Sequence, residues 1–263
     1  MIRVGVVGVA GRMGSRVVRL LSEFAGLSLG SALERDTQRQ GVDAGELAGV
    51  GALGVPITND PAEAARNCDV LIDFSAPAAC AVLAPACAEH GSAYVCASTG
   101  MGEVERIALD NAAQRVAVLE AANLSVGVNV MRELVRTAAA RLGSDFDIEI
   151  FETHHKHKRD APSGTAYILG DAVLEARPGL DSVRARSGAD AVRADNSIGY
   201  SVARGGDVAG EHTVFFFGSG ERIELTHRSS SPDIFARGAL RAAKWLAQKE
   251  PGRYTMDDVL GIS

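Results

Sequence analysis

The sequence predicts an α/β protein with a Rossmann-like, doubly wound parallel sheet and a second α+β lobe that contains a mixed sheet. Two observations support this prediction. Strand-like runs alternate with helical segments up to about residue 123, which is typical of βαβ units. After that point, three strand-like runs follow one another with short, glycine-containing connections, which favours a mixed or antiparallel sheet.

The first lobe begins with a β-branched run at residues 2–7, followed by residues 15–24, which carry apolar residues at helical spacing. Further strands are expected at 27–33, 69–74 and 92–97, with a helix between the last two. The run VLIDF is almost continuously apolar, so we expect this strand to be covered on both faces.

The second lobe is expected to contain two helices and four strands. The helices are predicted at 126–142 and 165–176, and the strands at 146–153, 197–204, 211–217 and 221–228. An amphipathic helix then follows at 232–247 and is able to return to the first lobe.

Composition and charge exclude several kinds of partner. The net charge of −6 disfavours an extended nucleic-acid surface, because a phosphate backbone binds to a basic field. No apolar segment reaches the length that spans a membrane, and the first residues lack the pattern of a signal peptide, so a cytoplasmic location is expected. The four cysteines form no CxxC pair and read as reduced core thiols, and no metal site is expected.

A glycine loop joins the first strand to the first helix. Gly8, Gly11 and Gly14 allow backbone N–H groups and the positive helix end to approach a pyrophosphate. Glu34 ends the second strand about 20 residues further on, where an acidic side chain typically binds the adenosine ribose. Arg35 follows it and is able to pair with a 2′-phosphate, so the couple suggests NADH or NADPH. A plain glycine turn and a solvated Glu34-Arg35 turn remain the alternatives.

A basic segment is the second informative feature. Residues 154–159 comprise three histidines, two lysines and an arginine, which is unusual in an acidic protein and indicates an anionic ligand. Pro162 precedes a Ser-Gly-Thr helix start whose free N–H groups and hydroxyls suit a carboxylate. Lys158 adds a point charge, and a histidine is able to donate a proton near neutral pH. We therefore expect a small dicarboxylate substrate.

Three other interpretations compete for this segment. A zinc site from His154, His155 and His157 is disfavoured, because adjacent residues on a strand point to opposite faces and no cysteine lies nearby. Ser163 lacks the GxSxG context of a nucleophile. A solvated charge run, with Ser163 acting only as a helix cap, is the structural alternative.

The chain with these two features resembles the 4-hydroxy-tetrahydrodipicolinate reductase family, also called dihydrodipicolinate reductase, over nearly its full length. The resemblance rests on GVAGRMG at 8–14, DAGELAG at 43–49, AANLSVGVNVM at 121–131, ETHHKHKRDAPSGTA at 152–166, and GEHT and GERIELTH within 210–227. The HHxxKxDAPSGT string is highly specific to that family, whereas the glycine loop is shared with many dehydrogenases.

The resemblance implies a reductase of the diaminopimelate route to lysine that acts on a cyclic imine dicarboxylate. Residues 1–125 would form a dinucleotide-binding Rossmann domain, completed by the C-terminal helix 236–263. Residues 126–235 would form a substrate-binding and oligomerisation domain that assembles a homotetramer.

By similarity, His154 and Lys158 are the proton-donating pair, and the residues that hold the carboxylates are His155, Lys158, Ser163, Gly164 and Thr165. The residues that line the cofactor, NADH or NADPH, are Gly8, Val9, Ala10, Gly11, Arg12, Met13, Glu34, Arg35, Ala97, Ser98, Thr99, Ala121, Ala122, Asn123 and Leu124.

The chain departs from the family pattern at two places. Ala97 and Ser98 stand in a turn that usually reads Gly-Thr-Thr-Gly, and alanine narrows the backbone angles if this position needs a positive φ. Leu124 replaces a common phenylalanine. Two rival functions stay open: a reductase of another imine or α-keto acid, and a nicotinamide-sensing regulator whose only support is the altered turn.

Overall fold

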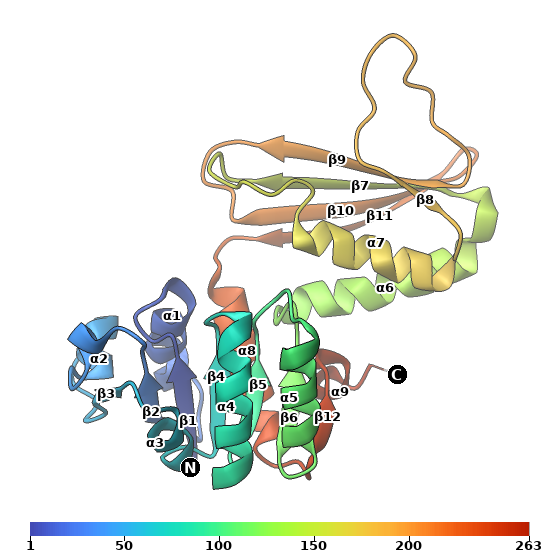
Figure 1. The fold of residues 1–263 in the computed structure, drawn as a ribbon. Coiled ribbons are helices and arrows are strands. Elements are labelled where there is room, and N and C mark those ends of the chain that lie inside the picture. Colours follow the sequence, from blue (N-terminus) through green and yellow to red (C-terminus); the bar gives the residue numbers. More distant parts are fainter. Residues whose placement is uncertain (263) are drawn as a thin grey trace. The chain divides into compact units, whose positions relative to one another are not determined.

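The computed structural model describes residues 1–262, and the chain divides into two compact units (Figure 1). The first unit comprises Met1–Val126 and the chain from Asp233 onward, and the second comprises Gly127–Pro232. None of the helices within the described residues is long and apolar enough to cross a membrane.

Seven parallel strands form the sheet of the first unit, in the order β12-β6-β5-β4-β1-β2-β3. Their bounds are β1 Ile2–Val7, β2 Leu27–Leu33, β3 Ile57–Thr58, β4 Val70–Asp73, β5 Ala93–Cys96, β6 Ala117–Glu120 and β12 Gly252–Tyr254. The first six strands follow the 3-2-1-4-5-6 order of doubly wound dinucleotide-binding sheets, and the strand order reverses between β1 and β4. The predicted Rossmann-like fold is therefore confirmed.

Helices cover both faces of this sheet (Figure 1). They are α1 Arg12–Leu20, α2 Ala44–Ala48, α3 Pro61–Arg66, α4 Pro77–His90, α5 Glu103–Ala113, α8 Asp233–Leu246 and α9 Met256–Leu260. The helices α1, α2, α8 and α9 share one apolar cluster with the strands, and α3, α4 and α5 share the other. All four cysteines lie buried in the second cluster as free thiols, as the sequence predicts.

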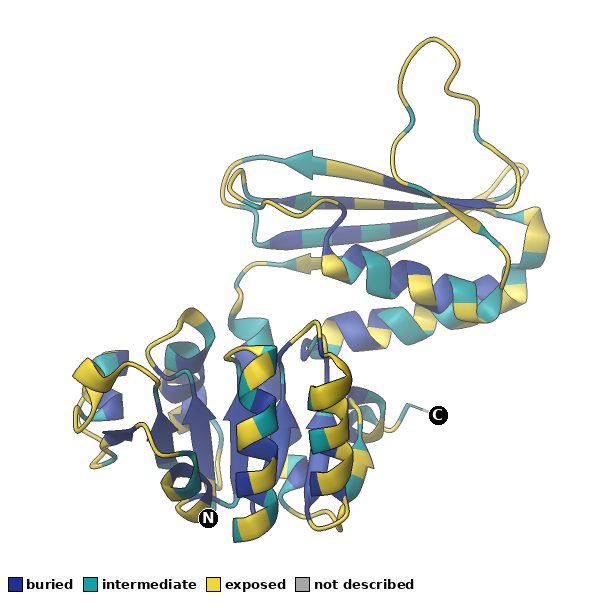
Figure 2. Cartoon of the chain, in the orientation of Figure 1, coloured by how far each residue is buried: buried dark blue, intermediate teal, exposed yellow. Residues whose placement is uncertain are grey.

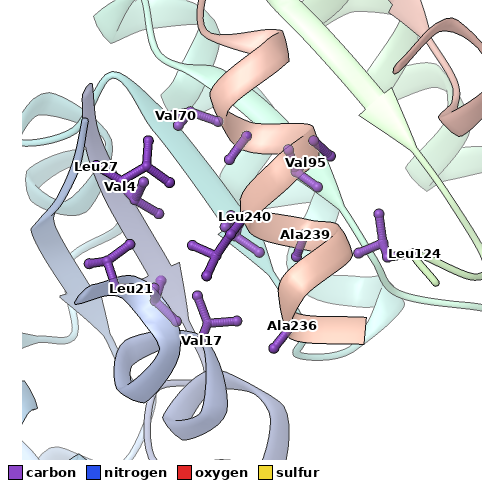
Figure 3. Packing of buried hydrophobic residues seen from close by; sticks show 14 of the residues in the cluster. Val4, Val17, Leu21, Leu27, Val70, Val95, Leu124, Ala236, Ala239 and Leu240 are labelled. Atoms are coloured by element: carbon purple, nitrogen blue, oxygen red, sulfur yellow. The ribbon is translucent and has the colours of Figure 1, made fainter. Parts of the chain in front are cut away.

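The C-terminal segment returns to the first unit, but not as one helix over 236–263. Helix α8 ends at Leu246, because the chain soon reaches Pro251, which lacks the N–H that a helix interior requires. Residues Gly252–Tyr254 instead pair with β6 as an added parallel strand, and the short helix α9 follows. The expected continuous helix is therefore wrong, although α8 packs into the core of the first unit (Figure 3).

Close packing of α8 depends on one glycine. A Cβ at Gly238 would lie 1.7 Å from the backbone oxygen of Leu124, a contact that only backbone movement relieves. Ala239 and Leu240 follow directly and are fully buried in the same cluster (Figure 3). The absent side chain thus brings the helix against the segment that follows β6.

We predict that Gly238→Ala destabilises the protein, although alanine is the better helix former by about 1 kcal/mol. The clash with a backbone carbonyl outweighs that gain, so the free energy of unfolding in urea should fall by about 1–3 kcal/mol. The exposed Arg241→Ala in the same helix is the control and should change stability by less than about 0.5 kcal/mol. A Gly238→Ala protein as stable as the wild type would contradict this packing.

The second unit holds a five-stranded mixed sheet in the order β11-β10-β7-β9-β8. Its strands are β7 Asp147–His154, β8 Asp181–Val183, β9 Ser197–Arg204, β10 Gly210–Phe217 and β11 Arg222–Ser229, and its helices are α6 Val126–Leu142 and α7 Gly164–Ala176. Strands β7, β8 and β9 run parallel, whereas β10 is antiparallel to both of its neighbours. The predicted mixed sheet is confirmed.

Burial alternates along β7, which fixes the face on which each of its side chains lies (Figure 2). Ile148 and Ile150 are buried in an apolar cluster with α6 and α7. Glu152 and His154 continue the same alternation and are buried as well. Two ionisable side chains therefore lie on the helix-covered face of this strand.

Candidate active site

The sequence-predicted cofactor residues all lie at the carboxyl ends of the parallel strands of the first unit. Residues 8–13 follow β1, residues 34–35 follow β2, residues 97–99 follow β5 and residues 121–124 follow β6. Open parallel sheets bind ligands at this edge, beside the point where the strand order reverses. The four segments are therefore placed where a dinucleotide is usually held.

The glycine loop forms a cradle of bare backbone. Gly8 has a φ of +68°, which few other residues adopt without strain. A Cβ at Gly14 would lie 2.2 Å from the Gly8 carbonyl oxygen, and one at Gly11 would lie 3.0 Å from it. Gly11 precedes the first residue of α1, so the first N–H groups of that helix have no side-chain cap from this residue. This geometry fits a pyrophosphate group.

Glu34 connects the glycine loop to the segment after β2. One carboxylate oxygen accepts a hydrogen bond from the Ala10 N–H at 3.1 Å, and the other accepts from the Arg35 N–H at 2.9 Å. The carboxylate is half-buried, whereas Arg35 is exposed. Glu34 and Arg35, the residues predicted to contact the ribose or its 2′-phosphate, thus lie next to each other directly after β2.

The turn after β5 tolerates alanine. Among the described residues, Asn196 is the one non-glycine with a positive φ, so Ala97 occupies ordinary backbone space. Ser98 is buried, and its hydroxyl has no hydrogen-bond partner within residues 1–262. A buried hydroxyl without a partner at this edge suits a polar group of a bound ligand, such as a carboxamide.

In the second unit, Glu152 is the centre of a buried polar cluster. Its carboxylate contacts His154 Nδ1 at 2.5 Å and accepts two hydrogen bonds from Arg204, both at 2.8 Å. It also accepts the Ser163 backbone N–H at 3.1 Å. Burial alone would raise the pKa of Glu152, but the bonds from His154 and Arg204 outweigh it and lower this pKa to about 2. The carboxylate is therefore ionised at neutral pH.

His212 and Ser163 form the other half of this cluster. Ser163 caps α7, since its hydroxyl accepts the Ala166 N–H, and it also contacts His212 Nε2 at 2.9 Å. The rings of His154 and His212 meet edge to face at 5.1 Å. Burial, followed by the charge of His154, lowers the pKa of His212 to about 4, so this histidine is neutral at neutral pH.

The remaining predicted ligands lie on the loop after β7 and at the start of α7. Lys158 pairs with the Asp160 carboxylate at 2.8 Å, and its side chain is 20% exposed. His155 and Thr165 are half-buried, and Gly164 is exposed at the first turn of α7. The basic segment is therefore divided: His154 lies in the buried cluster, and Lys158 lies at its solvent side.

Sequence reasoning missed Glu152, Arg204 and His212. The signal for Glu152 was present, because it continues the buried alternation of Ile148 and Ile150. His212 likewise alternates with buried residues of β10. Arg204 carries no such signal, since only the pairing of β9 with β7 brings it opposite His154.

We predict that His212 makes the protein less stable at acid pH. Its pKa falls from 6.5 to about 4 on folding, so the neutral form is favoured and its contribution is lost as the pH falls from 6.5 toward 4. Between pH 7 and 4, the free energy of unfolding of the wild type should fall by about 3 kcal/mol more than that of His212→Gln. Urea unfolding at both pH values measures this difference.

The exposed His157→Gln serves as the control and should follow the wild type at both pH values. Parallel pH dependences for the wild type and His212→Gln would show that His212 is not held neutral by the fold.

Comparisons with known proteins cover the whole chain. The family model described as dihydrodipicolinate reductase, N-terminus, matches residues 2–124, and the one described as dihydrodipicolinate reductase, C-terminus, matches residues 127–260. The 4-hydroxy-tetrahydrodipicolinate reductase of Anaeromyxobacter dehalogenans is 50% identical over 266 residues, covering 100% of this chain and 98% of the relative. The enzyme of that name from Chromohalobacter salexigens is 48% identical over 267 residues, covering 100% and 99%.

Solved structures share the fold. A dipicolinate-bound dihydrodipicolinate reductase from Paenisporosarcina sp. TG-14 superposes with a TM-score of 0.79 at 23% identity, covering 97% of each chain. An amine dehydrogenase from Mycobacterium smegmatis gives a TM-score of 0.63 at 18% identity, covering 97% of this chain and 95% of the other. Because the family models and the relatives together span the sequence, this chain belongs to the dihydrodipicolinate reductase family.

Proposed function

We propose that this chain reduces 4-hydroxy-tetrahydrodipicolinate to tetrahydrodipicolinate with hydride from NADH or NADPH, in the diaminopimelate route to lysine. Its full-length relatives carry the name of this activity. The structural observation that carries the proposal is the buried pairing of His154 with an ionised carboxylate, beside the Ser163 helix start in the second unit. This arrangement suits an acid that serves an anionic substrate.

The stoichiometry defines what the protein must provide. Substrate and product differ by one hydroxyl replaced by hydrogen, so a hydride and a proton enter and water leaves. The reduced nicotinamide supplies the hydride when it is bound. The chain itself has to hold the dinucleotide, neutralise two carboxylates and deliver the proton.

Each of the predicted cofactor segments would contact a different part of the dinucleotide. The glycine cradle and the first turn of α1 would hold the pyrophosphate, and Glu34 with Arg35 would meet the adenosine ribose. The segments 97–99 and 121–124 would line the remaining carboxyl edge. Ser98 offers its unpaired hydroxyl there.

The substrate residues provide positive charge and N–H donors. Ser163, Gly164 and Thr165 begin α7, where the backbone N–H groups of the first helical turn and the helix dipole favour a carboxylate. Lys158 is able to exchange Asp160 for a substrate carboxylate, because an ion pair near the surface is worth only about 0–1 kcal/mol. His155 contributes a further donor beside them.

His154 and Lys158 are the proposed proton donors. Loss of water from the substrate, in which the hydroxyl leaves one carbon and a proton leaves the next, gives a conjugated imine. Hydride addition to the far carbon of this system gives an electron-rich enamine, which takes up a proton at carbon. An imidazolium supplies that proton, and the ionised Glu152 stabilises the charged ring before transfer. Lys158 lies on the loop that follows His154 in the chain and adds a cationic field for the two carboxylates.

We further propose a cytoplasmic homotetramer that assembles through the uncovered face of the second sheet. Helices α6 and α7 pack against the opposite face. The uncovered face carries Phe151, Phe215 and Phe217, two of which are exposed, and the rings of Phe215 and Phe217 stack at 5.4 Å. Aromatic side chains gathered on one sheet face are typical of a protein interface.

Lys158→Ala is expected to reduce turnover by at least about 100-fold, because the variant lacks the cation that faces the substrate carboxylates. Oxidation of NADH with freshly generated 4-hydroxy-tetrahydrodipicolinate measures this loss. The dissociation constant for NADH should stay within about twofold, since the loop lies in the second unit. Lys156→Ala, an exposed lysine on the same loop, is the matched control and should keep normal turnover. Undiminished turnover in Lys158→Ala would refute the assigned substrate site.

Glu34→Ala is expected to weaken NADH by about tenfold and NADPH by much less. NADH has both ribose hydroxyls available to the carboxylate, whereas NADPH carries a 2′-phosphate that a carboxylate repels and Arg35 attracts. Fluorescence titration of each dinucleotide measures the two dissociation constants. Equal losses for both cofactors would argue against a ribose contact at Glu34.

A further inference from the structure

We propose that Glu152 is a positioning residue, which together with Arg204 holds the His154 ring and the Ser163 helix start as one preassembled part of the substrate site. The inference rests on the proposed function, because that function gives His154 its task. It concerns a side chain that does not itself have to touch the substrate. Glu152 is 1% exposed and has partners at both oxygens.

Strand pairing explains why these groups meet. Glu152 and His154 are two residues apart on β7, so their side chains lie on the same face of the sheet. Arg204 is the register partner of His154 on the parallel strand β9, and His212 is the partner of Glu152 on β10. Three neighbouring strands thus contribute to one buried cluster.

The contacts of Glu152 link two parts of the site that the chain separates by a loop. One oxygen receives His154 Nδ1, and the other receives the backbone N–H of Ser163. Arg204 donates to both oxygens and also to the Asp160 carbonyl oxygen within the intervening loop. A movement of Glu152 would therefore displace the histidine, the loop and the helix start together.

The same contacts determine which nitrogen of His154 exchanges a proton. An ionised carboxylate only accepts hydrogen bonds, so Nδ1 carries a proton and Nε2 is left for the substrate. The Nε2 side is lined by a glycine: a Cβ at Gly210 would lie 3.0 Å from Nε2. The missing side chain leaves room at the nitrogen that the chemistry needs.

Several charged or titratable groups surround His154 and bear on its pH response. Glu152 lies on its own strand, Arg204 on β9 and His212 on β10, with His227 opposite His212 on β11. Lys158 and Asp160 belong to the loop. Of these, Glu152 is the carboxylate in direct contact with a ring nitrogen of His154.

The test is the substitution Glu152→Gln, which keeps the shape and removes the charge. We expect kcat to fall by about 100-fold, and the pH above which kcat declines to move to lower pH. The dissociation constant for NADH should not change. Glu152→Asp keeps the charge with a shorter arm, so it should retain the wild-type pH limb with a smaller loss of kcat, about tenfold.

Glu149→Gln is the matched control. Glu149 lies three residues earlier on β7, on the opposite face, and pairs with two arginines, Arg186 and Arg193. Its substitution removes a carboxylate from two guanidinium groups but leaves His154 untouched. The pH profile of Glu149→Gln should therefore match that of the wild type.

A second readout separates this inference from the proposed function. Nitrogen-15 NMR of the imidazoles reports directly whether His154 carries its proton on Nδ1, without any substrate. In the wild type and in Glu149→Gln the Nδ1–H form is expected, and in Glu152→Gln this preference is lost. An inactive wild type with these NMR results would refute the proposed function only.

The positioning role is overturned by either of two results. One is a Glu152→Gln protein that keeps the wild-type pH profile and the Nδ1–H form. The other is a Glu152→Asp protein whose pH limb shifts as far as that of Glu152→Gln. In both cases the carboxylate would be a structural group of the second unit.

Discussion

A carboxylate that leaves water needs a partner for each of its oxygens, and the need of Glu152 organises much of the second unit. Its carboxylate pairs with Arg204 on the neighbouring strand β9 and contacts His154 on its own strand. It also anchors the backbone of Ser163, where α7 begins. The requirement that a buried charge be satisfied thus links the strand, the loop and the helix start of the proposed substrate site.

The first unit depends on a different constraint, the close approach of backbones. Gly14 and Gly238 each stand where a side chain would collide with a carbonyl oxygen. One contact closes the loop between β1 and α1, and the other seats α8 beside the segment after β6. Both lie at the carboxyl edge of the sheet. Glycine therefore provides both the tight helix packing and the exposed backbone N–H groups of the loop after β1.

Periodicity in the sequence was sufficient for the main architecture. Most of the long strands and helices carry apolar residues at period two or 3.6 and appear near their predicted positions, but the 11-residue helix α5 was not predicted. The elements that were missed include β3, α2, β12 and α9, which span two to five residues each. Segments of two to five residues are too short to show a hydrophobic period. The helices among them depend on caps such as Asp43, and the strands depend on pairing with strands distant in sequence.

The site was predictable only where its residues are close in sequence. His154, Lys158 and Ser163 lie within one motif, so their types and spacing pointed to an anion. Arg204 lies 52 residues from Glu152, and His212 lies 49 residues from Ser163, so only the strand order brings them together. The concern over Ala97 also required coordinates, because the sign of φ cannot be read from residue type alone.

The return of α8 to the first unit has a consequence for biogenesis. Ala236, Ala239 and Leu240 complete one apolar cluster of that unit, yet they are translated after the whole of the second unit (Figure 3). The second unit is a continuous stretch and is fully synthesised while the sheet before it still lacks α8. In a nascent chain, the part of this sheet face that α8 covers therefore stays exposed until α8 has left the ribosome.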